Sequence, residues 1–200
     1  MSRISIIVPA YHANERLYEL TRACLDSVWE TDAQIIIVAD KASYTVNTNA
    51  GLRAASGDIL VVANNDMVFE GAWLDGLLSV IQAGYDIATC WTSDQLAGGA
   101  SLPMDGITAG AKFGSLFAMT REVYQTVGAF DEQFGGYFSD TDYRRRALDA
   151  GFSIGRNNSL TVRHLAKATY KETDPSDAEF QRSRILFEMK HGYGADTDED

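Results

Sequence analysis

Short apolar runs separated by polar segments make up the first third of the chain. Residues 4–8, 34–39 and 58–63 are apolar at nearly every position, and each run ends in polar or turn-forming residues. Such runs are typical of strands that are buried on both faces of a parallel sheet. Residues 15–29 carry apolar side chains at helical spacing, and residues 48–55 are also expected to form a helix. This β-α-β-α-β order predicts an α/β fold, a Rossmann-like open and mostly parallel sheet flanked by helices.

The rest of the chain mixes helical and strand patterns. Apolar periodicity predicts helices over residues 72–83, 121–127, 139–150 and 177–191, and strands over residues 86–91, 112–119, 152–154 and 160–162. Residues 95–111 are rich in Gly, Ala and Ser and have little periodicity, which indicates a mobile loop. Residues 195–200 include four acids and are expected to be a disordered tail. We therefore expect a single domain over residues 1–194.

The polar residues at the ends of the three buried strands are candidates for a ligand site. In open α/β sheets, ligands bind beyond the carboxyl ends of the strands. Those ends carry Pro9-Ala10-Tyr11, Asp40-Lys41 and Asn64-Asn65-Asp66. The first loop contains no glycine, so the Gly-rich fingerprint of dinucleotide-binding Rossmann domains is absent, as is a P-loop. A phosphate group would have to be bound in another way.

Composition narrows the classes of partner. Apolar residues make up 46% and charged residues 22% of the chain, as in ordinary globular proteins. The net charge of −11 argues against non-specific nucleic-acid binding, which needs a basic surface. No apolar run approaches the length of a membrane span, so we expect neither a membrane span nor a secretory leader. Cys24 and Cys90 fit buried thiols in a reducing compartment, so a cytoplasmic location is expected, and the oligomeric state stays open.

Each polar group at these strand ends has a chemical interpretation and a structural one. The ring of Tyr11 could stack on a nucleobase or pack within its loop, and the spacing favours neither. Asp40 could accept hydrogen bonds from a base or a ribose, but alone it is more typical of a turn. The carboxylate of Asp66 could bind Mg²⁺ or Mn²⁺, or it could stand in a metal-free turn.

Further candidates lie in the second half of the chain. Asp140 and Asp142 follow an aromatic and glycine-rich loop, at the start of the helix expected over residues 139–150. Acids in the first turn stabilise a helix, but a carboxylate that faces a pocket can instead act as a general base, and the spacing does not decide between these roles. His164 follows an apolar run and would matter for chemistry only if the fold brought it near Asp66.

Taken in order, these segments resemble a known family. The stretches SIIVPAYHANERL, IIIVADKAS with NAGLRAASGDILVVANND, GSLFAMTREVYQTVGAFDEQF and YFSDTDYRRRALDAGFSI, followed by VRH, resemble the family 2-type inverting glycosyltransferases with the GT-A fold. The resemblance extends over residues 4–165. Its most specific part is the G-x-F-D-E-x-F pattern, followed by x-D-x-D before a helix that ends in glycine.

The resemblance implies a nucleotide-diphospho-sugar donor, expected to be UDP-linked, and a carbohydrate or other hydroxyl acceptor. It implies that the nucleotide-binding residues are Pro9, Ala10, Tyr11, Asp40 and Asn65. Asp66 stands at the metal-binding carboxylate of the D-x-D motif and His164 at the late histidine near the metal, which implies a divalent cation, Mn²⁺ or Mg²⁺. Asp140 matches the second acid of the family's E-D pair, which is the catalytic base. Nothing selects among Lys41, Arg53 and Lys112 as a cation for the diphosphate.

Three positions depart from the family pattern. Asn64 replaces the first acid of D-x-D, Lys41 replaces an aspartate, and Ser139 replaces the first acid of the E-D pair. These substitutions leave open a second interpretation, a catalytically inactive nucleotide-sugar-binding protein. A nucleotidyltransferase is a third interpretation, but that chemistry usually needs a Gly-rich basic loop, which residues 10–15 do not supply.

Overall fold

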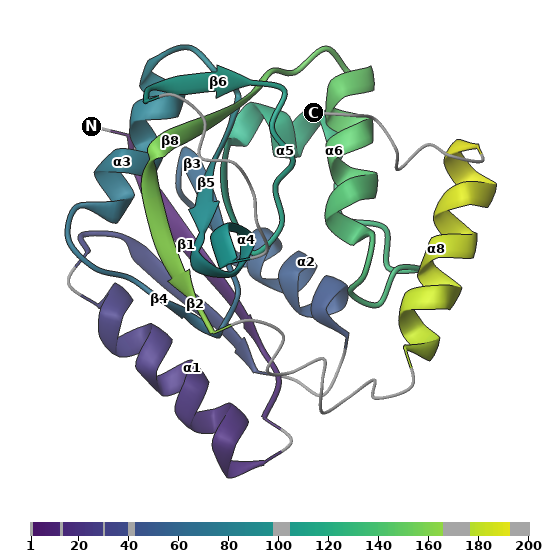
Figure 1. The fold of residues 1–200 in the computed structure, drawn as a ribbon, viewed down its shortest axis with the longest axis horizontal. Coiled ribbons are helices and arrows are strands. Elements are labelled where there is room, and N and C mark those ends of the chain that lie inside the picture. The colour runs from purple at the N-terminus through teal and green to yellow at the C-terminus, as the bar shows by residue number, and fades with distance from the viewer. Residues whose placement is uncertain are drawn as a thin grey trace.

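The computed structural model describes residues 2–12, 14–29, 31–39, 43–97, 105–165 and 177–192. It shows a mixed sheet with helices on both faces, which confirms the predicted α/β class (Figure 1). The last described helix, α8 (Ala178–His191), lies at the periphery beside α6 (Ser139–Asp149). No helix in the described ranges is long and apolar enough to cross a membrane.

Most strands of the sheet point in one direction. The strands are β1 (Ile4–Ala10), β2 (Gln34–Ala39), β3 (Ile59–Ala63), β4 (Met67–Val68), β5 (Ile87–Thr92), β6 (Ile107–Ala109), β7 (Leu116–Thr120) and β8 (Ile154–His164). Their order is β2-β1-β3-β7-β5-β8-β4, and β6 pairs with β8. β1 runs parallel to β2 and β3, β5 runs parallel to β8, and β7 lies antiparallel between β3 and β5. The carboxyl ends of β1, β3, β5 and β8 therefore meet at one edge of the sheet.

The remaining helices connect these strands. They are α1 (Glu15–Val28), α2 (Tyr44–Ala54), α3 (Trp73–Gln82), α4 (Ser93–Ala97) and α5 (Arg121–Val127). Side-chain caps define three of their starts: Asn14 accepts from the backbone N–H of Leu17, Ser43 from Val46, and Thr120 from Val123. These caps satisfy N–H groups that have no partner inside the helix.

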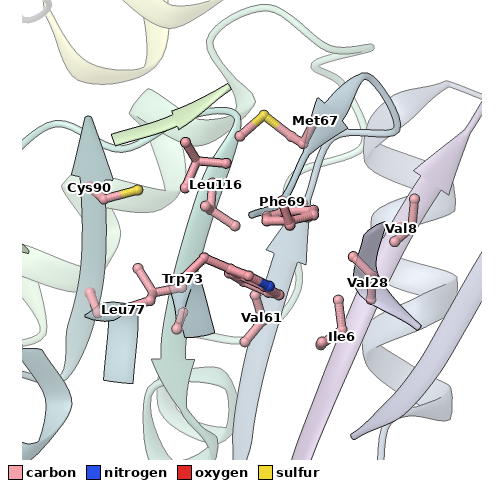
Figure 2. Packing of buried hydrophobic residues seen from close by; sticks show 14 of the residues in the cluster. Ile6, Val8, Val28, Val61, Met67, Phe69, Trp73, Leu77, Cys90 and Leu116 are labelled. Atoms are coloured by element: carbon pink, nitrogen blue, oxygen red, sulfur yellow. The ribbon is translucent and has the colours of Figure 1, made fainter. Parts of the chain in front are cut away.

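The sheet separates two hydrophobic clusters, because successive side chains of a strand point to opposite faces. On β1, Ile6 and Val8 belong to one cluster and Ile7 to the other. α1 and α3 cover the first cluster, in which Trp73 packs over the sheet (Figure 2). α2, α5 and α6 cover the second cluster, and the buried ring of Tyr143 anchors α6 there.

The loop predicted over residues 95–111 is wrong at residues 95–97 and 107–109, which form regular structure, whereas residues 105–106 and 110–111 are irregular as expected. α4 includes Gln95 to Ala97, and β6 spans Ile107–Ala109, while residues 98–104 lie outside the described residues. β6 forms because β8 provides an antiparallel partner for it. A short segment that is held by such a distant partner has no periodicity of its own.

The two strands predicted over residues 152–154 and 160–162 are one strand, β8. The polar pair Asn157 and Asn158 interrupts the apolar pattern, but both side chains have partners. The Asn157 amide donates to the Gly76 carbonyl oxygen at 2.8 Å, and the Asn158 amide donates to the Thr108 hydroxyl at 3.3 Å. β8 is therefore continuous through a polar stretch.

Smaller differences concern element ends. α2 begins at Tyr44 instead of residue 48, β7 begins at Leu116 instead of residue 112, and the two-residue strand β4 was not predicted. Asp40, Lys41 and the predicted tail 195–200 lie outside the described residues.

Candidate functional site

A cavity of about 540 Å³ lies beyond the carboxyl ends of β1 and β3, and its size is typical of a small-molecule site. Its lining includes most of the candidate residues that the structure describes, namely Pro9, Ala10, Tyr11, Asn64, Asn65, Asp66, Asp140 and His164, whereas the described candidates Arg53, Lys112 and Asp142 do not line it. Asp94, which follows β5, and Tyr44, at the start of α2, also line it. The shared edge of the parallel strands thus collects residues from distant parts of the sequence in one place.

The contact between Asp66 and His164 is created by the short strand β4. β4 pairs antiparallel with the end of β8, so that Met67 lies opposite His164. The backbone N–H of Leu165 donates to the Asp66 carbonyl oxygen at 3.0 Å. As a result, His164 Nε2 lies 3.0 Å from Asp66 Oδ1, and both side chains are buried.

His164 contacts a second carboxylate through its other ring nitrogen. Nδ1 lies 3.0 Å from Asp94 Oδ1 and 3.4 Å from the Ser115 hydroxyl. Burial disfavours the charged ring, but the hydrogen bond and charge of Asp66, followed by those of Asp94, outweigh it and raise the pKa of His164. The ring is therefore held between two acids. Asp94 was not identified from the sequence, although it lies three positions after the predicted strand 86–91, at the same edge of the sheet.

Asp140 lies in the first turn of α6 and faces the same cavity. Burial raises the pKa of its carboxyl group, although the backbone N–H of Thr141, which donates to Oδ1 at 2.9 Å, opposes the rise. Its other oxygen lies against Gly114: a methyl group at that position would come within 3.0 Å of Asp140 Oδ2. A carboxylate with a raised pKa at a cavity wall is suited to accept a proton.

The loop before α6 holds Asp140 in place. Phe138 adopts a left-handed backbone conformation with φ of 63°, which is costly for a residue other than glycine. Its ring packs against Phe180 and Phe187 of α8, with centroid distances of 5.5 Å to each. The hydroxyl of the buried Ser139 donates to the Gly136 carbonyl oxygen at 2.6 Å. Packing by α8 therefore supports the backbone that leads into Asp140.

Tyr44 was not identified from the sequence. Burial raises the pKa of its hydroxyl, and the negative charges of Asp140 and Asp66 raise it further. Tyr44 lines the same cavity as both carboxylates.

Asp142 is separated from the cavity chemistry, although the sequence allowed either acid of this pair to be catalytic. Its buried carboxylate lies 2.9 Å from Arg146 Nε, 2.7 Å from Lys190 Nζ and 2.8 Å from His191 Nε2. Burial opposes its ionisation, but hydrogen bonds from Lys190, His191 and Arg146 outweigh burial, so the pKa of Asp142 is lowered. Asp142 fastens α8 to α6.

The side chains of the Asn64-Asn65-Asp66 turn differ in whether they have hydrogen-bond partners. The amide of Asn65 donates to the Thr21 hydroxyl at 2.8 Å, which ties this side chain to α1. Asn64 Oδ1 is buried and has no hydrogen-bond partner among the described residues. Buried polar oxygens without a partner are rare, and a ligand that supplies one is a common reason.

The donor atoms here suit a divalent cation, although no set of three His, Cys, Asp or Glu side chains in the described part of the chain is arranged to hold one. Asp66 and His164 contact each other, and Asn64, whose side-chain oxygen is buried without a described partner, lines the same cavity. Carboxylate, amide oxygen and imidazole are ligands that Mn²⁺ accepts. With few protein ligands, such an ion would need further oxygens from a bound molecule.

Comparison with known families finds no matching family model and no similar curated protein. Among solved structures, the fold is similar to that of S. aureus TarS, residues 1–349, with a TM-score of 0.61 and 11% identity over 96% of this chain and 72% of that chain. TarS is a GT-A-type glycosyltransferase. At this low identity, the likeness shows the fold alone: an α/β fold similar to that of TarS.

Proposed function

We propose that this protein is an inverting glycosyltransferase, which moves a sugar from a nucleotide-diphospho-sugar to an acceptor hydroxyl. The observation that carries the proposal is the shared cavity: Asp140, with its raised pKa, lines the same space as the Asp66–His164 pair. The glycosyltransferase-like fold supports the same reaction class. The family 2-type resemblance of the sequence adds the expectation of a UDP-linked donor.

In this proposal the donor lies across the strand ends. Pro9, Ala10 and Tyr11 contact the nucleoside, with Asp40 at the base and Asn65 beside the nucleotide. Asp66 and His164 would hold a divalent cation, Mn²⁺ or Mg²⁺, which would supply positive charge against the departing diphosphate. Asn64, whose side-chain oxygen has no described partner, lines the same cavity.

Asp140 is the general base of the proposed reaction. It accepts the proton of the acceptor hydroxyl while that oxygen attacks the anomeric carbon, and the bond between this carbon and the diphosphate oxygen breaks. The proton then leaves Asp140 for solvent, and the nucleoside diphosphate departs. Burial supports this role, because a carboxylate with a raised pKa is a stronger base.

A catalytically inactive nucleotide-sugar-binding protein is the second candidate. The neutral Asn64 in place of an acid is the observation that favours it, because an amide coordinates a cation more weakly than a carboxylate. Ser139 weighs less, since its hydroxyl is buried and bonded to the Gly136 carbonyl oxygen. A nucleotidyltransferase stays third.

The test is the hydrolysis and transfer of UDP-sugars in the presence of Mn²⁺. We expect Asp140→Asn to reduce turnover at least ~100-fold while UDP affinity, measured by calorimetry, stays the same. Asp149→Asn is the matched control, because Asp149 lies on the same helix with a side chain that is 61% exposed. Turnover that survives Asp140→Asn would overturn the assignment of the base, and UDP binding without turnover by the unaltered protein would favour the inactive alternative.

A further inference from the structure

A second cavity of about 360 Å³ adjoins the first one. The two share the lining residues Asp94, Gly114, Ser115, Phe138 and Asp140. Lys112, Thr141 and Arg144 line only the second cavity, whereas Tyr11, Asp66 and His164 line only the first. Asp140 therefore stands at the boundary, with the proposed donor residues on one side and two cations on the other.

Neither cation of the second cavity forms an ion pair with an acid of the described residues. Lys112 is exposed, and no ion pair joins it to an acid of the described residues. Arg144 donates to two backbone oxygens, from Nε to Ala111 at 3.3 Å and from Nη2 to Gly110 at 3.1 Å. The nearby acids are engaged otherwise: Asp94 contacts His164, and Asp140 is the proposed base.

The three consecutive arginines Arg144, Arg145 and Arg146 of α6 differ in their partners. Arg145 pairs with Asp149 at 3.2 Å, and Arg146 pairs with Asp142 at 2.9 Å. Only Arg144 of the three turns to the second cavity, where it meets carbonyl oxygens and no described carboxylate. Asp94 and Asp140 also line the second cavity, but no ion pair joins either of them to Lys112 or Arg144 within the described residues.

We propose that the second cavity binds the acceptor, and that this acceptor carries an anionic group, a phosphate or a carboxylate, which Lys112 and Arg144 bind. The inference rests on the proposed function. The acceptor hydroxyl must touch Asp140 while its oxygen attacks a sugar held in the first cavity, so the rest of the acceptor extends into the second one. Arg144 suits this role, because a guanidinium presents several N–H groups in a planar fork that matches phosphate and carboxylate oxygens.

The donor diphosphate is the competing anion for these two cations. The positions of the side chains favour the acceptor, because neither Lys112 nor Arg144 lines the cavity that contains Asp66 and His164. A role in donor binding would make UDP affinity depend on both cations, whereas the acceptor role makes it independent of them.

Calorimetric titrations with three matched probes test the proposal: glycerol 3-phosphate, glycerate and neutral glycerol. The protein is first saturated with UDP and Mn²⁺, so that the first cavity is filled. We expect glycerol 3-phosphate or glycerate to bind at least about tenfold more tightly than glycerol, and the stronger of the two identifies the anion. Lys112→Ala and Arg144→Gln should each weaken that binding about fivefold or more, while UDP affinity is unchanged.

Arg53→Gln is the control, because Arg53 is an exposed cation of α2 that lines neither cavity. Lys112→Ala is the primary variant, since none of the hydrogen bonds described above involves the Lys112 side chain. Equal affinity for glycerol and both anions would overturn the proposal, as would anion binding that both substitutions leave unchanged. An equal loss of UDP affinity in the two variants would assign the cations to the donor. Failure of the unaltered protein to bind UDP would instead refute the proposed function, and titration of the nucleotide-free protein would still decide whether the anion site exists.

Discussion

Replacing Asp142 by asparagine removes the negative charge on which three basic side chains converge. The carboxylate is fully buried, whereas Arg146, Lys190 and His191 around it are 24%, 32% and 11% exposed. Asparagine has the same shape, so the core packing of α6 stays intact. The change therefore isolates the electrostatic connection between α6 and α8.

The expected loss of unfolding free energy depends on the contacts that each basic side chain keeps after the substitution. Removing one member of a buried charge cluster typically costs 3–5 kcal/mol, because the remaining charges lose their compensation. Here Arg146 keeps the Val127 and Ala129 carbonyl oxygens, and Lys190 keeps Asp131 at 2.6 Å. We therefore expect the free energy of unfolding to fall by about 2 kcal/mol, which is about 4–8 °C in melting temperature for a chain of this size.

Urea unfolding followed by circular dichroism at pH 7 measures this change, and hydrogen exchange in residues 178–191 reports whether α8 loosens. Asp149→Asn is the control on the same helix: it removes an exposed pair with Arg145 and should cost less than about 0.5 kcal/mol. If Asp142→Asn costs no more than this control, Asp142 does not fasten α8 to α6.

The lowered pKa of Asp142 also predicts how the free energy of unfolding depends on pH. The pKa of Asp142 is lowered in the folded protein, so its stabilisation is complete above the unfolded value of about 4 and is lost as pH falls through the folded value. The part of the unfolding free energy that depends on the Asp142 charge should therefore be present at pH 5 and shrink below about pH 4 in the unaltered protein relative to Asp142→Asn. A difference that grows on acidification would contradict the assignment.

Three further substitutions or reactions test other features. Gly114→Ala should place a methyl group 3.0 Å from Asp140 Oδ2 and displace the proposed base. Steady-state kinetics should then show turnover reduced at least about tenfold at unchanged UDP affinity. Unchanged turnover would mean that Gly114 does not position the base. His164→Gln should weaken Mn²⁺ affinity at least about tenfold in a calorimetric titration, because a neutral amide replaces the imidazole, and equal affinity would remove His164 from the proposed metal site. Cys24 and Cys90 are buried with pKa values raised to about 12, so a thiol reagent at pH 8 should label them only after unfolding in urea, and rapid labelling of the native protein would contradict their burial.

The first half of the fold was predictable because its strands are continuous apolar runs. β1 and β3 are buried on both faces as expected, but the prediction of a fully buried strand over residues 34–39 is wrong, because β2 lies at the edge of the sheet and Ile37 is 43% exposed. Ile6, Ile7 and Val8 face alternate clusters, yet all are apolar, so the sequence shows a continuous run at this place. β6 and the middle of β8 were not predictable, because their polar or small residues are satisfied by partners elsewhere. The Asn157 amide needs the Gly76 carbonyl oxygen of α3, which no local pattern reveals.

The sequence predicted those residues of the candidate site that lie at strand ends or within the stretches that resemble the family. The common direction of β1, β3, β5 and β8 explains why residues from all four strand ends meet. The approach of Asp66 to His164 depends on β4, a strand of two residues that leaves no periodic signal. Asp94 and Tyr44 were not identified because only the packing of the folded chain places them in the lining of the cavity. The structural role of Asp142 could be distinguished from the proposed catalytic role of Asp140 only from the contacts of Asp142 with α8.

Helix α8 contacts both the lining of the first cavity and the buried carboxylate of Asp142. Near its start, Glu179 lies against Gly135 and lines the first cavity, and near its end Lys190 and His191 hold Asp142, two positions after Asp140. A ligand that touches this wall can bind only to molecules in which the helix is docked, so its apparent affinity is reduced by the undocked fraction. Conversely, an occupied cavity should slow proteolysis of residues 178–191, which makes the C-terminal helix a reporter of ligand binding.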